Sequence, residues 1–145
     1  MTPMEALQSS LRAEHAAVYV YGVLGARADA GSDAALASSV RAAYQQHMSR
    51  RGQLEQRVRR AGGTPAVAAV GYVVPPGLGN PAGIRAAALE IEDRAAASYA
   101  QLAGSTTGSD RAWAVSALTD TAVRRLQLGG DAQDLPGLPD VVLPD

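Results

Sequence analysis

The stretch Leu11-Arg12-Ala13-Glu14-His15-Ala16-Ala17-Val18 decides how the chain folds. Apolar and small residues recur through and around it at alternating steps of four and three, which is the pattern of a core-facing helix. These positions are Leu7, Leu11, Val18, Tyr21 and Gly25. Glu14 falls on the same stripe. Because an unpartnered buried charge is very costly, its carboxylate must be paired, bound to a metal or protonated.

The composition favours a helical protein. Of the 145 residues 30 are Ala, the residue with the highest helix propensity, and Phe is absent. Small side chains let helices approach closely, which favours an all-α bundle built as one domain. The formal charge of −1 gives no overall attraction to nucleic acid or to a membrane surface. Without Cys, disulfides and thiolate metal ligands are excluded, and we expect a cytoplasmic protein.

Capping residues divide the chain into four expected helices. Thr2-Pro3 and Asn80-Pro81 each combine an N-cap with a proline at the first helical position. We expect Ser32 to cap the second helix and Ser109-Asp110 the fourth, and a glycine pair follows each of these two helices. The predicted helices cover about residues 3–28, 33–61, 81–104 and 109–128, the bundle covers 1–129, and an extended tail covers 130–145.

The segment 64–80 differs from the rest of the chain. It contains prolines, glycines and an apolar run, and it has no helical periodicity. Two long helices joined by a short turn, followed by a long crossover and two more helices, form a known bundle topology. We therefore predict an antiparallel ferritin-like four-helix bundle with a long crossover between its second and third helices.

Each predicted helix carries one ionisable residue on or near its inward face. These residues are Glu14, His47, Glu92 and Asp120. Bundles that bind two metal ions need this arrangement, because iron and manganese are held by carboxylate oxygens and imidazole nitrogens from facing helices.

At these residues the chain resembles the ferritin-like superfamily and, more closely, a ferritin-like domain of unknown function common in actinobacteria. The matching segments are Glu14-His15-Ala16-Ala17-Val18-Tyr19, Tyr44-x-x-His47-x-x-x-Arg51, Leu89-Glu90-Ile91-Glu92-Asp93 with Tyr99, and Ala122-Val123-Arg124. The resemblance covers the chain to about Gly129 and implies a bundle with a metal pattern of Glu, Glu-x-x-His, Glu and Glu-x-x-His on successive helices.

This chain departs from the metal pattern that the resemblance implies. Glu14, His47 and Glu92 fit it. Tyr44 stands where the second helix should carry a bridging Glu, and Asp120 is a shorter acid where the fourth helix should carry Glu. Val123 replaces the last His. A site for two metal ions would therefore lack one bridging carboxylate and one histidine ligand.

Three hypotheses remain for the buried ionisable residues. The first is a polar network of Glu14 and His47 with Tyr44 or Arg51 as partners. The second is an iron or manganese site formed by Glu14, His47, Glu92 and Asp120. The third is a small-molecule pocket. Asp120 also has Arg124 four residues later, where the two could form a surface pair.

Five arginines lie toward the end of the predicted helix 33–61. They are Arg50, Arg51, Arg57, Arg59 and Arg60. We interpret them as solvated charges that suit a helix C-terminus, because aromatic or groove-entering elements typical of nucleic-acid binding are missing. We expect neither a nucleic-acid nor a membrane partner.

The favoured function is that of a non-catalytic bundle whose metal site has decayed into a buried polar network and which forms a homodimer. The alternative is a metal-dependent oxidoreductase or iron-handling protein with an unusual ligand set.

Overall fold

Four α-helices make up most of the protein in the computed structural model, which describes residues 1–139. They are α1 (Pro3–Arg27), α2 (Ala34–Arg60), α3 (Pro81–Ser105) and α4 (Gly108–Gln127). Each end lies within one residue of its predicted position. Residues 130–139 contain turns and bends and continue the predicted tail, whereas 140–145 lie outside the described residues.

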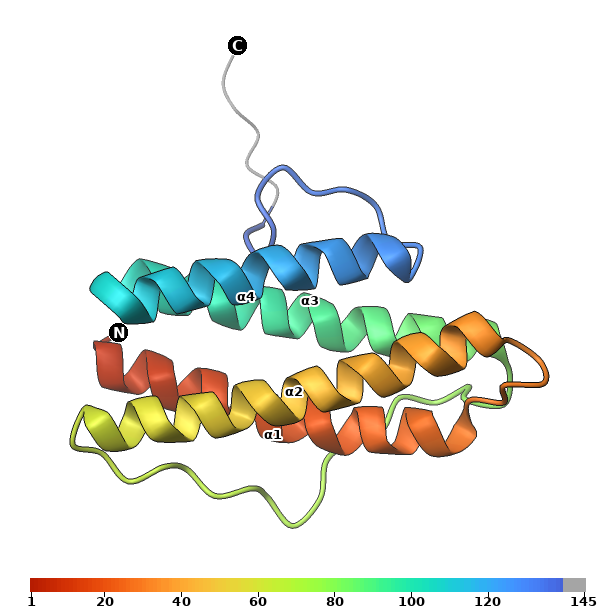
Figure 1. Cartoon of the computed structure of the whole chain (residues 1–145), viewed down its shortest axis with the longest axis horizontal. Coiled ribbons are helices and arrows are strands. Elements are labelled where there is room, and N and C mark those ends of the chain that lie inside the picture. Colours follow the sequence, from red (N-terminus) through yellow and green to blue (C-terminus); the bar gives the residue numbers. More distant parts are fainter. Residues whose placement is uncertain (140–145) are drawn as a thin grey trace.

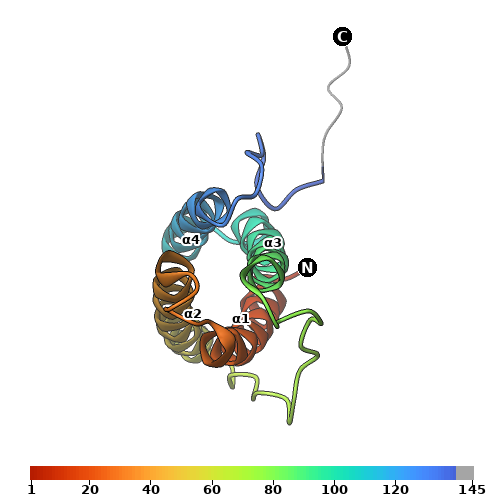
Figure 2. The same cartoon turned by 90° about the vertical axis from the view of Figure 1, so that its right-hand side faces the viewer.

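The helices form an antiparallel bundle. α1 runs antiparallel to α2 and to α3, and α4 runs antiparallel to α3 (Figure 1). Viewed end-on, the four helices surround a common axis with α2 and α3 diagonally opposed (Figure 2). Close packing joins α1 to α2, α1 to α3 and α3 to α4. The prediction of an all-α four-helix bundle is confirmed. Within residues 1–139, no helix combines the length and apolarity needed to cross a bilayer.

Parallel α2 and α3 require the intervening chain to return along the whole bundle. This crossover lies on the outer side of α1 (Figure 2). Gln8 Nε2 donates to the Thr64 carbonyl at 2.7 Å, and Gln8 Oε1 accepts from the Ala66 amide at 2.9 Å. His15 Nε2 lies 2.9 Å from the Ala66 carbonyl, and the rings of Tyr19 and Tyr72 are 5.5 Å apart. The start of the crossover is thus held on α1.

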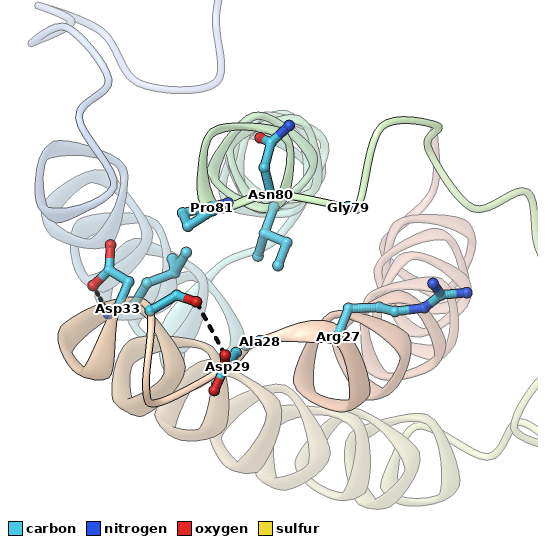
Figure 3. A pocket seen from close by; sticks show the side chains of 10 residues that line it. Arg27, Ala28, Asp29, Asp33, Gly79, Asn80 and Pro81 are labelled. Atoms are coloured by element: carbon cyan, nitrogen blue, oxygen red, sulfur yellow. Dashed lines mark hydrogen bonds between the residues drawn. The ribbon is translucent and has the colours of Figure 1, made fainter.

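The turn between α1 and α2 is built around aspartates. Ser32, the expected cap, instead donates its hydroxyl to Asp29 at 3.0 Å (Figure 3). Asp33 caps α2, since its Oδ1 accepts the Leu36 amide at 2.9 Å. The hydrogen bond from the Leu36 amide, followed by that from Arg85, lowers the pKa of Asp33. The predicted cap, Ser32, was therefore wrong by one residue, because its hydroxyl is bonded to Asp29 within the turn.

The start of α4 also differs from the prediction. Thr107 is the N-cap and its side chain makes no capping hydrogen bond. Asp110, expected as part of the cap, lies inside the first turn and pairs with Arg57 of α2. This ion pair holds the start of α4 against the end of α2.

Two apolar clusters fill the ends of the bundle. The first cluster lies around the α1–α2 turn and consists of Ala17, Val20, Tyr21, Leu24, Leu36, Val40, Ala43, Ile84, Ala87, Ala88, Ile91 and Leu128. The second cluster lies at the opposite end and consists of Ala6, Leu7, Leu11, Leu54, Val58, Leu102 and Ala114. Between them lie buried charged residues and a third, smaller apolar cluster of Ala95, Tyr99 and Ala117.

Candidate functional site

The polar interior is centred on three residues that lie near the middle of their helices. Glu14 lies in α1, His47 in α2 and Glu92 in α3, and all three are fully buried. Their positions follow from the four-three spacing of each helix, which directs the mid-helix residue inward. The structure therefore brings together three of the four ionisable residues predicted to face inward.

His47 bridges the two carboxylates. Its Nδ1 lies 2.8 Å from Glu14 Oε2, and its Nε2 lies 3.2 Å from Glu92 Oε1. Both nitrogens can donate to a carboxylate only when the imidazole is protonated. Burial opposes that charge, but Glu14 and then Glu92 outweigh it and raise the pKa of His47 to about 9. His47 is therefore an imidazolium at neutral pH.

Two buried tyrosines donate further hydrogen bonds to the carboxylates. Tyr21 donates its hydroxyl to Glu92 Oε1 at 2.5 Å, and Tyr99 donates its hydroxyl to Glu14 Oε1. Burial and the adjacent carboxylate raise the pKa of each tyrosine, so both remain protonated donors. The Tyr21 ring also stacks on His47, with centroids 5.1 Å apart.

Glu92 accepts on one oxygen only. Burial disfavours its charge, but His47 outweighs that effect and lowers the pKa of Glu92. Its Oε2 is buried and has no hydrogen-bond partner within residues 1–139. One ordered water molecule would satisfy this oxygen.

Arg50 and Arg124 add two further cations. The Arg50 side chain is only 4% exposed, and it donates to Thr121 Oγ1 at 3.1 Å and to the Tyr99 hydroxyl at 3.4 Å. Arg124 reaches Glu92 Oε1 at 3.5 Å and also donates to Gln46. Together with His47, the arginines place three positive charges beside three carboxylates, those of Glu14, Glu92 and Asp120.

The donor geometry does not fit a metal ion. Glu14 and Glu92 lie against opposite nitrogens of one imidazole ring, so the three groups do not converge on a common point. Within residues 1–139, no cluster of three or more His, Asp or Glu side chains is arranged to hold a metal. The positive charge that a metal would bring to the carboxylates comes here from His47, Arg50 and Arg124.

Tyr44 and Arg51, the predicted partners of the network, lie outside it. Tyr44 is half-buried against the first cluster and lies beside Gly22 of α1. With 3.6 residues per turn, Tyr44 and Arg51 both lie about 40–60° to one side of His47 on α2. The network extends to the other side, toward α3 and α4, where Arg50 lies. This helical offset explains why Arg50 takes the place predicted for Arg51.

Asp120 lies at the rim of the site and not in its centre. Its side chain is 52% exposed, and its Oδ2 accepts from Gln46 Nε2 at 3.2 Å and from Arg50 at 3.4 Å. Its predicted partner Arg124 turns inward to Glu92 instead. The prediction that Arg50 is a solvated surface charge was wrong. A polar acceptor set in α3 and α4, Tyr99 with Thr121, was the one signal in the sequence for a buried arginine.

A family model and a solved structure are similar to the chain. A family model described as "Domain of unknown function (DUF4439)" matches residues 6–140. The crystal structure of a conserved hypothetical protein, rv2844, from Mycobacterium tuberculosis is similar, with 29% sequence identity and a TM-score of 0.79. That match covers 88% of this chain and 94% of the other. No curated protein matches the chain.

Proposed function

The chain belongs to the DUF4439 family, and we propose that it is a non-catalytic, ferritin-like bundle whose ancestral two-metal centre is replaced by protonated side chains. The observation that carries this proposal is the position of two cations, His47 and Arg124, at the buried carboxylates of the bundle centre. A third cation, Arg50, pairs with Asp120 at the rim. A network already balanced in charge has no electrostatic need for a metal.

The ferritin-like origin is supported by topology and by register. The long crossover between α2 and α3 gives the helix directions of that class of bundle. Glu14, His47 and Glu92 lie at the mid-length positions where such bundles carry their ligands. Two of the remaining ligand positions lack the group that the pattern requires: Tyr44 has no carboxylate to bridge two ions, and Val123 has no ligand atom.

Metal loading tests the absence of a two-metal centre. Protein purified without an affinity tag is incubated anaerobically with Fe(II) or Mn(II), desalted and submitted to elemental analysis. We expect a metal-to-chain ratio near zero and an unchanged melting temperature. About two metals per chain, lost in Glu14→Gln and retained in the surface variant Glu90→Gln, would contradict the proposal.

We propose further that such a protein acts by association and forms a homodimer. Three valines of the crossover, Val67, Val70 and Val73, are almost fully exposed. Exposed apolar groups gathered on one segment are typical of protein contacts. Light scattering after gel filtration should give twice the mass of one chain. Val70→Asp should reduce the measured mass to that of one chain. Ala68→Asp introduces the same charge without removing a large apolar group, so it should reduce the measured mass less.

A further inference from the structure

The side of the bundle between α2 and α4 is its polar seam. The close helix pairs lie on the other three sides, and α2 and α4 meet mainly through long polar side chains. A cavity of about 250 Å³ lies in this seam. We call it the seam cavity, and its polar lining consists of Gln46, Ser49, Arg50, Gln53, Ser116 and Asp120. Trp113 forms an apolar part of the wall.

The seam cavity differs from the pocket at the α1–α2 turn. That pocket has a volume of about 50 Å³, and Asp29 and Asp33 lie in its wall (Figure 3). Both carboxylates are engaged in the fold, Asp29 with the Ser32 hydroxyl and Asp33 with Arg85 and the Leu36 amide. The seam cavity has a larger volume than an engineered cavity of about 150 Å³ that holds benzene. It therefore has room for a small organic molecule.

The floor of the seam cavity is a buried guanidinium with one weak anionic partner. Arg50 donates through NH1 to Tyr99 and Thr121, and through NH2 to the Ala117 carbonyl at 3.2 Å. The one carboxylate bound to Arg50 within residues 1–139 is that of Asp120, which makes a single contact of 3.4 Å and is half exposed. The other terminal hydrogens of the guanidinium already have neutral acceptors, so the NH2 hydrogen at Asp120 is the one that faces an anion. Asp120 therefore holds a position that a better-oriented carboxylate can occupy.

We propose that the seam cavity binds a small organic carboxylate, which displaces Asp120 from the Arg50 guanidinium. The amide of Gln46, which donates to Asp120 at 3.2 Å, is then free to donate to the incoming carboxylate. The Ser49 and Ser116 hydroxyls supply further donors, and the apolar part of the ligand packs on Trp113. Asp120, whose side chain is already 52% exposed, moves into solvent when the ligand carboxylate takes its place. This ligand site shares Arg50 with the charged network of the proposed function, but metal loading tests the network and butyrate binding tests the site, so either proposal can fail alone.

Trp113 provides a direct signal for binding, because it is the single tryptophan of the chain. Its fluorescence is followed while butyrate, or the uncharged butyramide of the same shape, is added to the full chain. We expect a saturable change with butyrate and none with butyramide. In Asp120→Asn the competing carboxylate is absent, so butyrate should bind about fivefold more tightly.

Asp93→Asn is the matched control, since Asp93 is as exposed as Asp120 but pairs with Arg125, which does not line the seam cavity. It should leave the affinity for butyrate unchanged. An equal response to butyramide, a weaker affinity in Asp120→Asn, or no saturable response to butyrate in both the unaltered chain and Asp120→Asn would overturn the proposal. Melting temperatures of both variants, each altered at a partly exposed side chain, establish that they are folded.

Discussion

The second apolar cluster and the charged network occupy adjacent layers of one bundle but are stabilised differently. In the cluster, Leu54 is fully buried among other aliphatic side chains, and its burial stabilises the fold whatever the pH. In the network, His47 is equally buried but is stable only as a cation between two carboxylates. The stability of the network layer thus depends on the protonation of His47 and on the pairing of its charges. The stability of the apolar layer depends on how well its side chains fill the available volume.

Removal of the central cation should have the largest effect. In His47→Ala, Glu14 and Glu92 remain buried without the group that joins them, and breaking a buried pair in this way costs about 3–5 kcal/mol. Urea unfolding at neutral pH measures the loss. Met48→Ala, an exposed neighbour on α2, should change the free energy of unfolding by less than about 0.5 kcal/mol. Similar values for the two variants would show that the network contributes nothing to stability.

A truncation in the apolar layer should reduce the free energy of unfolding somewhat less, and this loss should be independent of pH. Leu54→Ala leaves a cavity in the second cluster, and such changes cost about 3 kcal/mol. We expect the same loss relative to the unaltered chain when urea unfolding is repeated at acidic and at alkaline pH. A loss that changed with pH would mean that the two layers are coupled and that the comparison fails.

The unaltered chain should itself lose stability as the pH rises. The pKa of His47 is about 9 in the folded state against an ordinary value of 6.5, so its contribution to stability is complete below pH 6.5 and is lost as the pH approaches 9. The lowered pKa of Glu92 acts in the opposite direction, since its contribution is present above 4.5 and is lost at lower pH. The free energy of unfolding should therefore be highest between about pH 4.5 and pH 6.5.

The size of this decline follows from the change in the pKa of His47. It corresponds to about 2–3 kcal/mol between pH 5 and pH 9. Urea unfolding across this range measures it, and Leu54→Ala should decline in parallel with the unaltered chain. A chain that is as stable at pH 9 as at pH 5 would be inconsistent with a buried imidazolium.

Sequence reasoning found the parts of the network that depend on one helix at a time. The inward positions of Glu14 and His47 follow from the four-three spacing within α1 and α2. The spacing in α3 predicted Glu92 only near the inward face, and the structure buries it fully. The burial of Arg50 does not follow from the spacing, because arginine side chains mostly extend into solvent unless they are paired. Its position depends on acceptors in other helices, Tyr99 and Thr121, and on the polar seam between α2 and α4. These relations are tertiary and have no local periodicity.

The smallest effect should come from an acid two residues away from the network. Glu90 lies on the exposed face of α3 and pairs with Arg94 four residues later. Glu90→Gln should cost no more than about 0.5 kcal/mol, because solvent screens such pairs. Glu92→Gln removes the same charge from the same helix but leaves His47 and Arg124 facing a neutral amide, so urea unfolding should show a larger loss. If the two variants lost the same free energy of unfolding, the total charge of α3, and not the burial of Glu92, would account for the stability of the network.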